Sequence, residues 1–184
     1  MTITRQCAPV LAAFSVVVGL AVSTCSTRAA ASPPPGFPDL AGFAAVPVED
    51  YFVTYLRGRR VVVFSTPHHL VCDFDAPADL ADPPTPRLHC AGDLPGTGAA
   101  CTAGTVEFSP SDAYEFLPYN WKCGDVDFRV DDFPYWSGKP LVSGEKLSYG
   151  NVTCAVGDDD LIACLDTSGG QHGFVVRASG SRAF

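Results

Sequence analysis

Six of the eight cysteines, those beyond residue 31, constrain the fold of this chain more than any other feature of its sequence. They lie between residues 72 and 164, at Cys72, Cys90, Cys101, Cys123, Cys154 and Cys164. An even number of cysteines is typical of the disulfide framework of an exported domain, and six allow fifteen connectivities. We expect consecutive cysteines to pair, and the chain-entropy model assigns loops of this size about 3 kcal/mol each. Zinc binding is the alternative, but no CxxC pair is present to begin a tetrahedral site.

The segment 147–176 shows what one such bridge implies for the backbone. Pairing Cys154 with Cys164 places Val156 opposite Ile162 in an antiparallel hairpin and leaves the acidic residues 158–160 in the turn. Directly opposed residues lie within the Cα separation that a disulfide accepts. Residues 173–176 then predict a third strand. The sequence therefore predicts a stapled hairpin with a third strand behind it.

Short segments of β-strand type recur along the rest of the chain. Segments 51–56, 61–64, 70–74, 88–90, 105–108, 120–123 and 126–130 are rich in β-branched and aromatic residues. No stretch sustains an apolar repeat of 3.6 residues, so helix should be scarce, and only Asp39 offers an N-cap for a single turn. We expect an all-β fold, a small disulfide-stabilised barrel or sandwich of short antiparallel strands.

The first half of the chain resembles a looser copy of the second. Residues 70–72 (LVC) correspond to 152–154 (VTC), and residues 88–90 (LHC) correspond to 162–164 (IAC). Each pair of segments spans one turn. We interpret this pattern as two related hairpin halves; independent convergence on the same stapled hairpin is the alternative.

Residues 1–31 have the pattern of a secretory signal peptide. Arg5 is followed by an apolar run of 13 residues at 10–22, and three alanines at 29–31 offer a cleavage site. The run is too short to span a bilayer, so we expect no transmembrane span after cleavage. Lipid attachment at Cys25 is an alternative route to the cell envelope. The predicted organisation is a signal peptide at 1–31, a Pro-rich spacer and N-terminal segment at 32–48, and a single β domain at 49–184, secreted or associated with the envelope.

The charge balance argues against nucleic acid as a partner. All 20 acidic residues lie beyond residue 31, whereas two of the 12 basic residues, Arg5 and Arg28, precede it, so the remainder carries a net charge of −10. Phosphate backbones attract positive surfaces. We therefore expect no nucleic-acid partner.

The chain resembles a group of small secreted proteins of actinobacteria, mycobacteria in particular, whose function is not established. The residues that carry this resemblance are 37–40 (FPDL), 50–51 (DY), 64–67 (FSTP), 90–96 (CAGDLPG), 140–141 (PL), 149–150 (YG), Cys154, 164–166 (CLD), 172–175 (HGFV) and 180–181 (GS). One departure lies at His68 and His69, where a turn containing glycine is more familiar. The resemblance implies export and a disulfide-bonded β fold, and it supplies no catalytic residue.

His172 is the first candidate for chemistry. Its ring could serve as a general base, oriented by Asp166, that activates Ser148 or Ser168 as the nucleophile of acyl transfer. No GxSxG elbow is present, however, and a histidine that closes the hairpin is the alternative. We therefore expect no catalytic residue.

Metal binding is the second candidate activity. His68, His69 and His89 with Asp73 carry the ligand types of a zinc or copper site, but adjacent histidines on a strand point to opposite faces. The acidic residues 158–160 lack the spacing of a calcium loop, and the arginines at 57, 59 and 60 have the pattern of an exposed turn. We expect no metal and no cofactor.

Aromatic residues between 114 and 136 are the candidate ligand surface. Trp121, Tyr135 and Trp136, together with His172, supply rings that stack on sugars or anchor a protein. A lid or core role for these rings is the alternative. The sequence thus favours a secreted, non-enzymatic binding or structural module with a protein, glycan or lipid ligand at the envelope. The alternatives are a cell-wall hydrolase using His172 and a carboxylate, or a histidine-based metal-binding protein.

Overall fold

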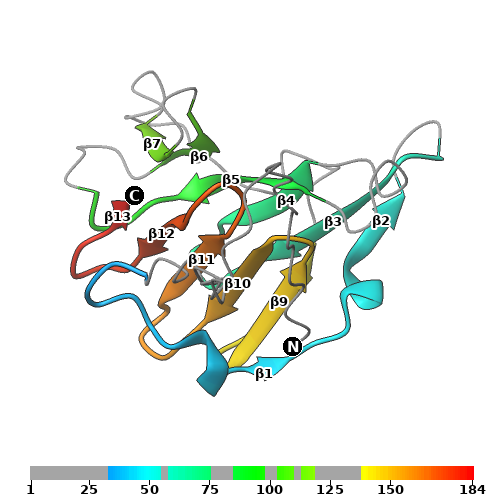
Figure 1. The fold of residues 1–184 in the computed structure, drawn as a ribbon, viewed down its shortest axis with the longest axis horizontal. Coiled ribbons are helices and arrows are strands. Elements are labelled where there is room, and N and C mark those ends of the chain that lie inside the picture. The colour runs from blue at the N-terminus through cyan, green and yellow to red at the C-terminus, as the bar shows by residue number, and fades with distance from the viewer. Residues whose placement is uncertain (1–32, 55–57, 76–84, 98–102, 110–112, 119–137) are drawn as a thin grey trace, which may run out of the picture. The chain divides into compact units, whose positions relative to one another are not determined.

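A computed structural model describes residues 33–54, 58–75, 85–97, 103–109, 113–118 and 138–184. Within these ranges the chain is built from short strands in two sheets, contains no α-helix, and has 3-10 turns at η1 (Leu40–Gly42) and η2 (Val48–Tyr51) (Figure 1). The all-β prediction is confirmed. The chain's internal contacts divide it between Ala31 and Ser32, and the fold below belongs to the second unit.

The N-terminal sheet is an antiparallel meander. It runs in the order β2 (Phe52–Thr54), β3 (Arg60–Ser65), β4 (Val71–Asp75), β5 (Arg87–Asp93), β6 (Ala103–Phe108) and β7 (Tyr114–Pro118), and β8 (Lys139–Pro140) pairs with β3. β5 shows the pattern of a half-buried strand, because Leu88 and Cys90 are buried whereas Arg87 is exposed and His89 half-buried.

The C-terminal sheet is a second meander. Its order is β1 (Ala44–Ala45), β9 (Glu145–Tyr149), β10 (Val152–Val156), β11 (Ile162–Asp166), β12 (His172–Val176) and β13 (Arg182–Ala183). The predicted hairpin register is confirmed, because Cys154 lies opposite Cys164 and Val156 opposite Ile162. The predicted third strand is β12, one residue longer than expected.

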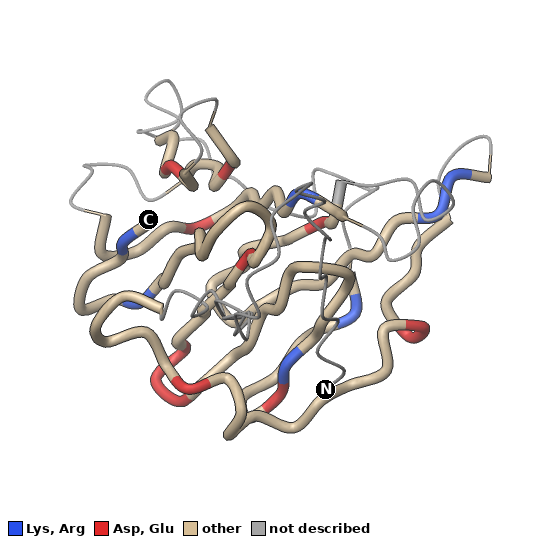
Figure 2. Tube along the Cα trace, in the orientation of Figure 1, with Lys and Arg blue, Asp and Glu red and all other residues tan. Residues whose placement is uncertain are grey.

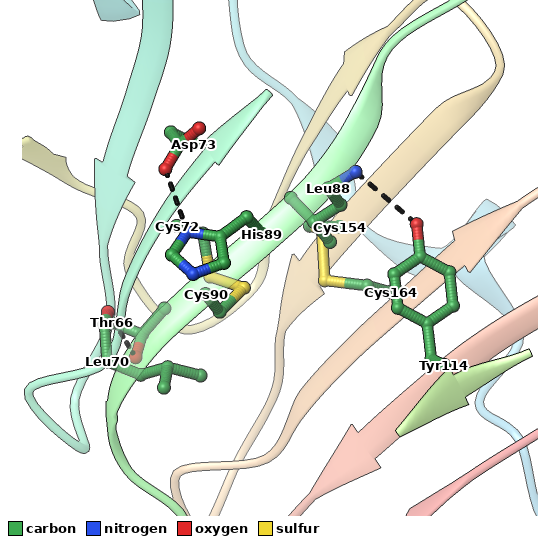
Figure 3. Close-up of a disulfide and its surroundings, with 10 residues drawn as sticks. All are labelled: Thr66, Leu70, Cys72, Asp73, Leu88, His89, Cys90, Tyr114, Cys154 and Cys164. Atoms are coloured by element: carbon green, nitrogen blue, oxygen red, sulfur yellow. Dashed lines mark hydrogen bonds and ion pairs between the residues drawn. A yellow bond between two sulfur atoms is a disulfide. The ribbon is translucent and has the colours of Figure 1, made fainter. Parts of the chain in front are cut away.

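The two sheets bury one shared core. Phe74 of the N-terminal sheet contacts Tyr149 of the C-terminal sheet, with ring centroids 5.8 Å apart, and Tyr114 contacts Phe174 at 5.6 Å. The two disulfides of the described residues, Cys72–Cys90 and Cys154–Cys164, lie in this core, one on each sheet (Figure 3). The fold is therefore a two-layer sandwich, and consecutive pairing is confirmed for these four cysteines. Cys101 and Cys123 lie outside the described residues.

The two meanders have equivalent registers, as the expectation of related halves requires. One inward row reads Phe64, Cys72, Cys90, Val106, Phe116, and its counterpart reads Leu147, Cys154, Cys164, Phe174, Ala183. In each row the disulfide joins the second and third strands of the set. A five-strand match of this kind goes further than the sequence similarity, which was confined to the cysteines and their neighbours.

The halves also exchange their short leading strands. β1 precedes the first meander but pairs with β9 of the second, and β8 precedes the second meander but pairs with β3 of the first. Both pairings are parallel, which the expectation of antiparallel strands missed, because two residues of strand carry no recognisable period. Leu141, which follows β8, is buried in the core, and Val46, which follows β1, packs against it.

Residues 33–43 form an N-terminal strap on the C-terminal sheet, where the sequence predicts only a spacer. Phe37 contacts Phe184 edge-to-face at 5.7 Å, and Asp39 caps η1 by accepting a hydrogen bond from the Ala41 amide, as expected. Lys146 Nζ donates to the Leu40 carbonyl oxygen at 2.7 Å. These contacts are ones that the proline-rich composition of residues 32–48 does not indicate, because they depend on partners that the C-terminal sheet supplies.

The predicted aromatic loop also begins differently. Residues 114–118 form strand β7, and Tyr114 is 3% exposed, so this residue belongs to the core and not to a ligand surface. Trp121, Tyr135 and Trp136 lie outside the described residues, as do the predicted strands at 120–123 and 126–130.

Candidate functional site

The carboxylate of Asp166 is a buried polar group with three hydrogen-bond donors around it. It lies at the end of β11, faces the other sheet and is 1% exposed. Its Oδ1 accepts hydrogen bonds from Asn151 Nδ2 at 2.5 Å and from the Ser168 amide at 2.7 Å, and its Oδ2 accepts one from the Tyr114 hydroxyl at 3.4 Å. Three donors thus compensate the loss of water around a buried carboxylate.

Tyr114 extends this cluster to the N-terminal sheet. Its hydroxyl oxygen accepts a hydrogen bond from the Leu88 amide at 3.4 Å (Figure 3) and donates one to Asp166. One side chain thus joins β5, β7 and β11. Burial first and the charge of Asp166 second raise the pKa of Tyr114 above its ordinary value of 10.0. Tyr114 therefore stays protonated and acts as a fixed donor.

Asn151 completes the cluster from the turn before β10. Its side-chain amide also donates to the Pro86 carbonyl oxygen at 3.4 Å. The backbone carbonyl oxygen of Asn151 accepts hydrogen bonds from the Thr167 amide and hydroxyl. Sequence reasoning missed Asn151. The signal was the Tyr-Gly-Asn turn, with Gly150 at φ 57°, which turns the chain so that Asn151 reaches the end of β11.

His172 lies beside Asp166 in the β11–β12 register but has a different partner. Its ring meets Phe108 edge-to-face at 5.7 Å, while the Asp166 oxygens are occupied by Asn151, Ser168 and Tyr114. Ser148 lies on the exposed side of β9, where its hydroxyl bonds to Thr153 at 2.8 Å. The geometry therefore separates Ser148 from His172 and Asp166. The Asp166 cluster instead holds the two sheets together through its hydrogen bond with Tyr114.

The three remaining histidines do not converge. His89 Nδ1 lies 3.2 Å from Asp73 Oδ2 on the outer face of the N-terminal sheet (Figure 3), and its Nε2 lies 3.8 Å from Glu107 Oε1. His68 and His69 lie in the β3–β4 turn, where the Thr66 amide and hydroxyl both donate to the Leu70 carbonyl oxygen. Among the described residues no group of histidine, cysteine or acidic side chains has the arrangement of a metal site.

The β3–β4 turn holds His69 in a backbone conformation that glycine usually adopts. His69 has φ 52°, in the left-handed region, and the neighbouring strand meets it with Gly92 at φ 142°. A Cβ on Gly92 would lie 2.3 Å from the His69 carbonyl oxygen. The close approach of this turn therefore requires a glycine at position 92 on the neighbouring strand.

The acidic turn 158–160 is a tight hairpin connection. Asp159 and Asp160 both have positive φ, 54° and 56°, and the Leu161 amide donates to the Asp158 carbonyl oxygen at 3.2 Å. Two successive left-handed residues define a type I′ turn, which favours Asp and Asn. These acids are exposed, and the charged residues are spread over both sheets (Figure 2).

Comparisons with protein-family models, with curated proteins and with solved structures found no match. In the part of the chain that the structure describes, no helix has the length and apolar character needed to cross a membrane.

Proposed function

We propose that this chain is an exported, non-enzymatic β-sandwich that acts as a binding or structural module at the cell envelope or outside the cell. The observation that carries the proposal is the pair of fully buried disulfides at equivalent positions of the two sheets. Structural disulfides form and persist in oxidising compartments and are rare in the cytosol. The signal-peptide pattern of residues 1–31 and the resemblance to small secreted actinobacterial proteins support the same compartment.

The Asp166 cluster supports a role without catalysis. A general base needs a lone pair directed at a substrate, but the Asp166 oxygens accept three internal hydrogen bonds, one of which, from Tyr114, joins the two sheets. The ring of His172 packs against Phe108. We propose that ligand contact, where it occurs, involves the aromatic residues Trp121, Tyr135 and Trp136.

Export and redox state are tested first. The full chain and a variant lacking residues 1–31 are expressed in the same actinobacterial host, and thiol trapping with peptide mapping follows each cysteine. The proposal predicts that the full chain is recovered outside the cytosol with Cys72–Cys90 and Cys154–Cys164 oxidised, and that the shortened chain stays inside. Recovery of the full chain in the cytosol with free thiols would sink the proposal.

The binding role is tested on the oxidised protein. Envelope glycans, vesicles of envelope lipids and secreted proteins of the same host are screened in parallel with hydrolysis of cell-wall substrates. Binding should fall when Trp121, Tyr135 and Trp136 are replaced by alanine, and His172→Ala should leave binding unchanged or lower only stability. Turnover that His172→Ala abolishes without loss of thermal stability would favour the hydrolase alternative, and metal found in tag-free protein by elemental analysis would favour the metal-binding one.

A further inference from the structure

The outer face of the C-terminal sheet binds the strap. We call this binding surface, which includes the cross-strand row below and the ring of Phe184, the seat. One cross-strand row on this face reads Lys146, Ala155, Ala163, Val175 and Arg182. Its three middle residues are small, apolar and buried, although they belong to neither hydrophobic cluster of the sandwich. The row is therefore apolar at its centre and basic at both ends.

Both basic ends hold the strap by its backbone. Arg182 Nη2 donates to the Pro35 carbonyl oxygen at 2.6 Å, and Lys146 Nζ donates to the Leu40 carbonyl oxygen at 2.7 Å. Four strand spacings of about 4.8 Å separate the ends of the row. Residues 35–40 and the long side chains of Lys146 and Arg182 together span this distance. Figure 1 shows the strap running from the β12–β13 side of the sheet to β1.

The strap's own sequence prepares it for this seat. The Phe37 amide donates to the Pro34 carbonyl oxygen at 3.1 Å, and Gly36 has φ 79°, which is a type II turn with proline and glycine at its two central positions. The turn presents Phe37 to Phe184, whose Cζ would lie only 3.2 Å from a Cβ at position 173, so Gly173 leaves room for this ring. Recognition thus uses one ring, two carbonyl groups and a preformed turn, all of them supplied by residues 33–43.

The connection after the strap is suited to act as a hinge. Ala44, Ala45 and Pro47 are exposed, and β1 pairs with β9 through only two residues before the chain crosses to the N-terminal sheet. The fold already contains one reciprocal exchange of leading strands, β1 onto β9 and β8 onto β3. The strap of a second copy of the chain is able to make the same contacts with this sheet, because exchanging straps between two molecules replaces each contact within a molecule by an identical contact between molecules.

We propose that the strap is an exchangeable element: the outer face of the C-terminal sheet accepts residues 33–43 of a second copy of this chain, and two copies form a reciprocal dimer. The closed monomer competes, because the tether keeps the strap at an effective concentration on the order of millimolar beside its own seat. The fraction of dimer therefore increases with protein concentration. It increases further when each closed monomer carries a damaged strap or a damaged seat, because only the dimer then joins an intact strap to an intact seat.

Two complementary variants test this exchange on the full exported chain. Phe37→Ala damages the strap and leaves the seat intact, whereas Phe184→Ala damages the seat and leaves the strap intact. In a mixture, the intact strap of the second variant fits the intact seat of the first. Analytical ultracentrifugation should find more heterodimer in the mixture than homodimer in either variant alone, by about threefold to tenfold, the value of one edge-to-face pair.

A labelled peptide of residues 33–43 gives an independent readout. It should bind Phe37→Ala protein more tightly than wild-type protein, whose own strap occupies the seat, and a peptide with Phe37→Ala should bind about threefold to tenfold more weakly. The double variant Arg182→Met, Lys146→Met should abolish peptide binding. This double variant takes the place of Phe184→Ala in the mixture if Phe184→Ala does not form the Cys72–Cys90 and Cys154–Cys164 disulfides. Monomers alone in the mixture, together with equal peptide binding by wild type and Phe37→Ala, would overturn the proposal.

Discussion

At the residue scale, single side chains decide whether the sandwich closes correctly. Tyr114 places one hydroxyl between the Leu88 amide and the Asp166 carboxylate, so both sheets depend on one oxygen. Gly92 has no side chain because the His69 carbonyl oxygen occupies that space.

The stability of the protein should fall at alkaline pH through Tyr114. Its folded-state pKa is raised above the ordinary 10.0, so its contribution is fully present below about pH 10 and is lost as pH rises toward the folded value. Urea unfolding between about pH 9 and pH 11 should show this decline, and Tyr114→Phe should make it shallower. Tyr51, whose pKa burial also raises, keeps part of the slope in that variant. An unchanged slope in Tyr114→Phe contradicts the assignment.

Tyr114→Phe should also lower stability at neutral pH. It leaves the Leu88 amide and one Asp166 oxygen without a partner in a buried place, at a cost of about 1–3 kcal/mol. Leu117→Ala on the same strand is the control, because Leu117 is 43% exposed and its loss should cost less than about 0.5 kcal/mol. Equal losses for both variants would show that the hydroxyl network is unimportant.

Gly92→Ala should destabilise the protein by about 2 kcal/mol or more, since both its φ of 142° and the contact at 2.3 Å resist a side chain. Gly42→Ala is the matched control: a Cβ there would meet nothing within 4 Å, and its φ is not positive. Chemical denaturation of the two variants measures the difference. A tolerated Gly92→Ala means that the β3–β4 turn adjusts more freely than its hydrogen bonds indicate.

At the scale of elements, each sheet is stapled at the same place by its own disulfide. Cys72–Cys90 closes a separation of 18 residues and Cys154–Cys164 one of 10. Because loop entropy varies with the logarithm of loop length, replacing either pair by alanines should cost a similar amount, about 3 kcal/mol. Urea midpoints of the two double variants test this, with Cys-to-Ala replacement of all four residues as the reference for additivity. A large asymmetry would mean that one hairpin keeps structure in the unfolded chain.

At the scale of the whole molecule, one core joins the two sheets, and its four half-cystines are at most 1% exposed. Reduction of these disulfides in the native protein should therefore require global unfolding. Thiol labelling should follow the unfolding rate and stay independent of reductant concentration once reductant is in excess. Peptide mapping separates these four cysteines from Cys101 and Cys123. Reduction faster than unfolding would show that the sandwich opens locally.

The sequence by itself determined the fold class, the C-terminal hairpin register and two disulfides, because each rests on local information. A period of two along a strand, turn residues between strands and cysteines 10 or 18 residues apart are all properties of neighbouring residues. The Cys154–Cys164 pairing was predictable because the hairpin brings those two residues opposite each other.

Only the tertiary structure decided the exchange of leading strands, the Asp166 cluster and the seat of the strap. Tyr114 and Asp166 are 52 residues apart, Leu40 and Lys146 are 106 apart, and Pro35 and Arg182 are 147 apart. No local pattern marks such partners, since a proline-rich segment has the same composition whether it is solvated or docked. The packing of two sheets around one core selects these contacts, and it is this packing that turned a predicted spacer into a bound strap.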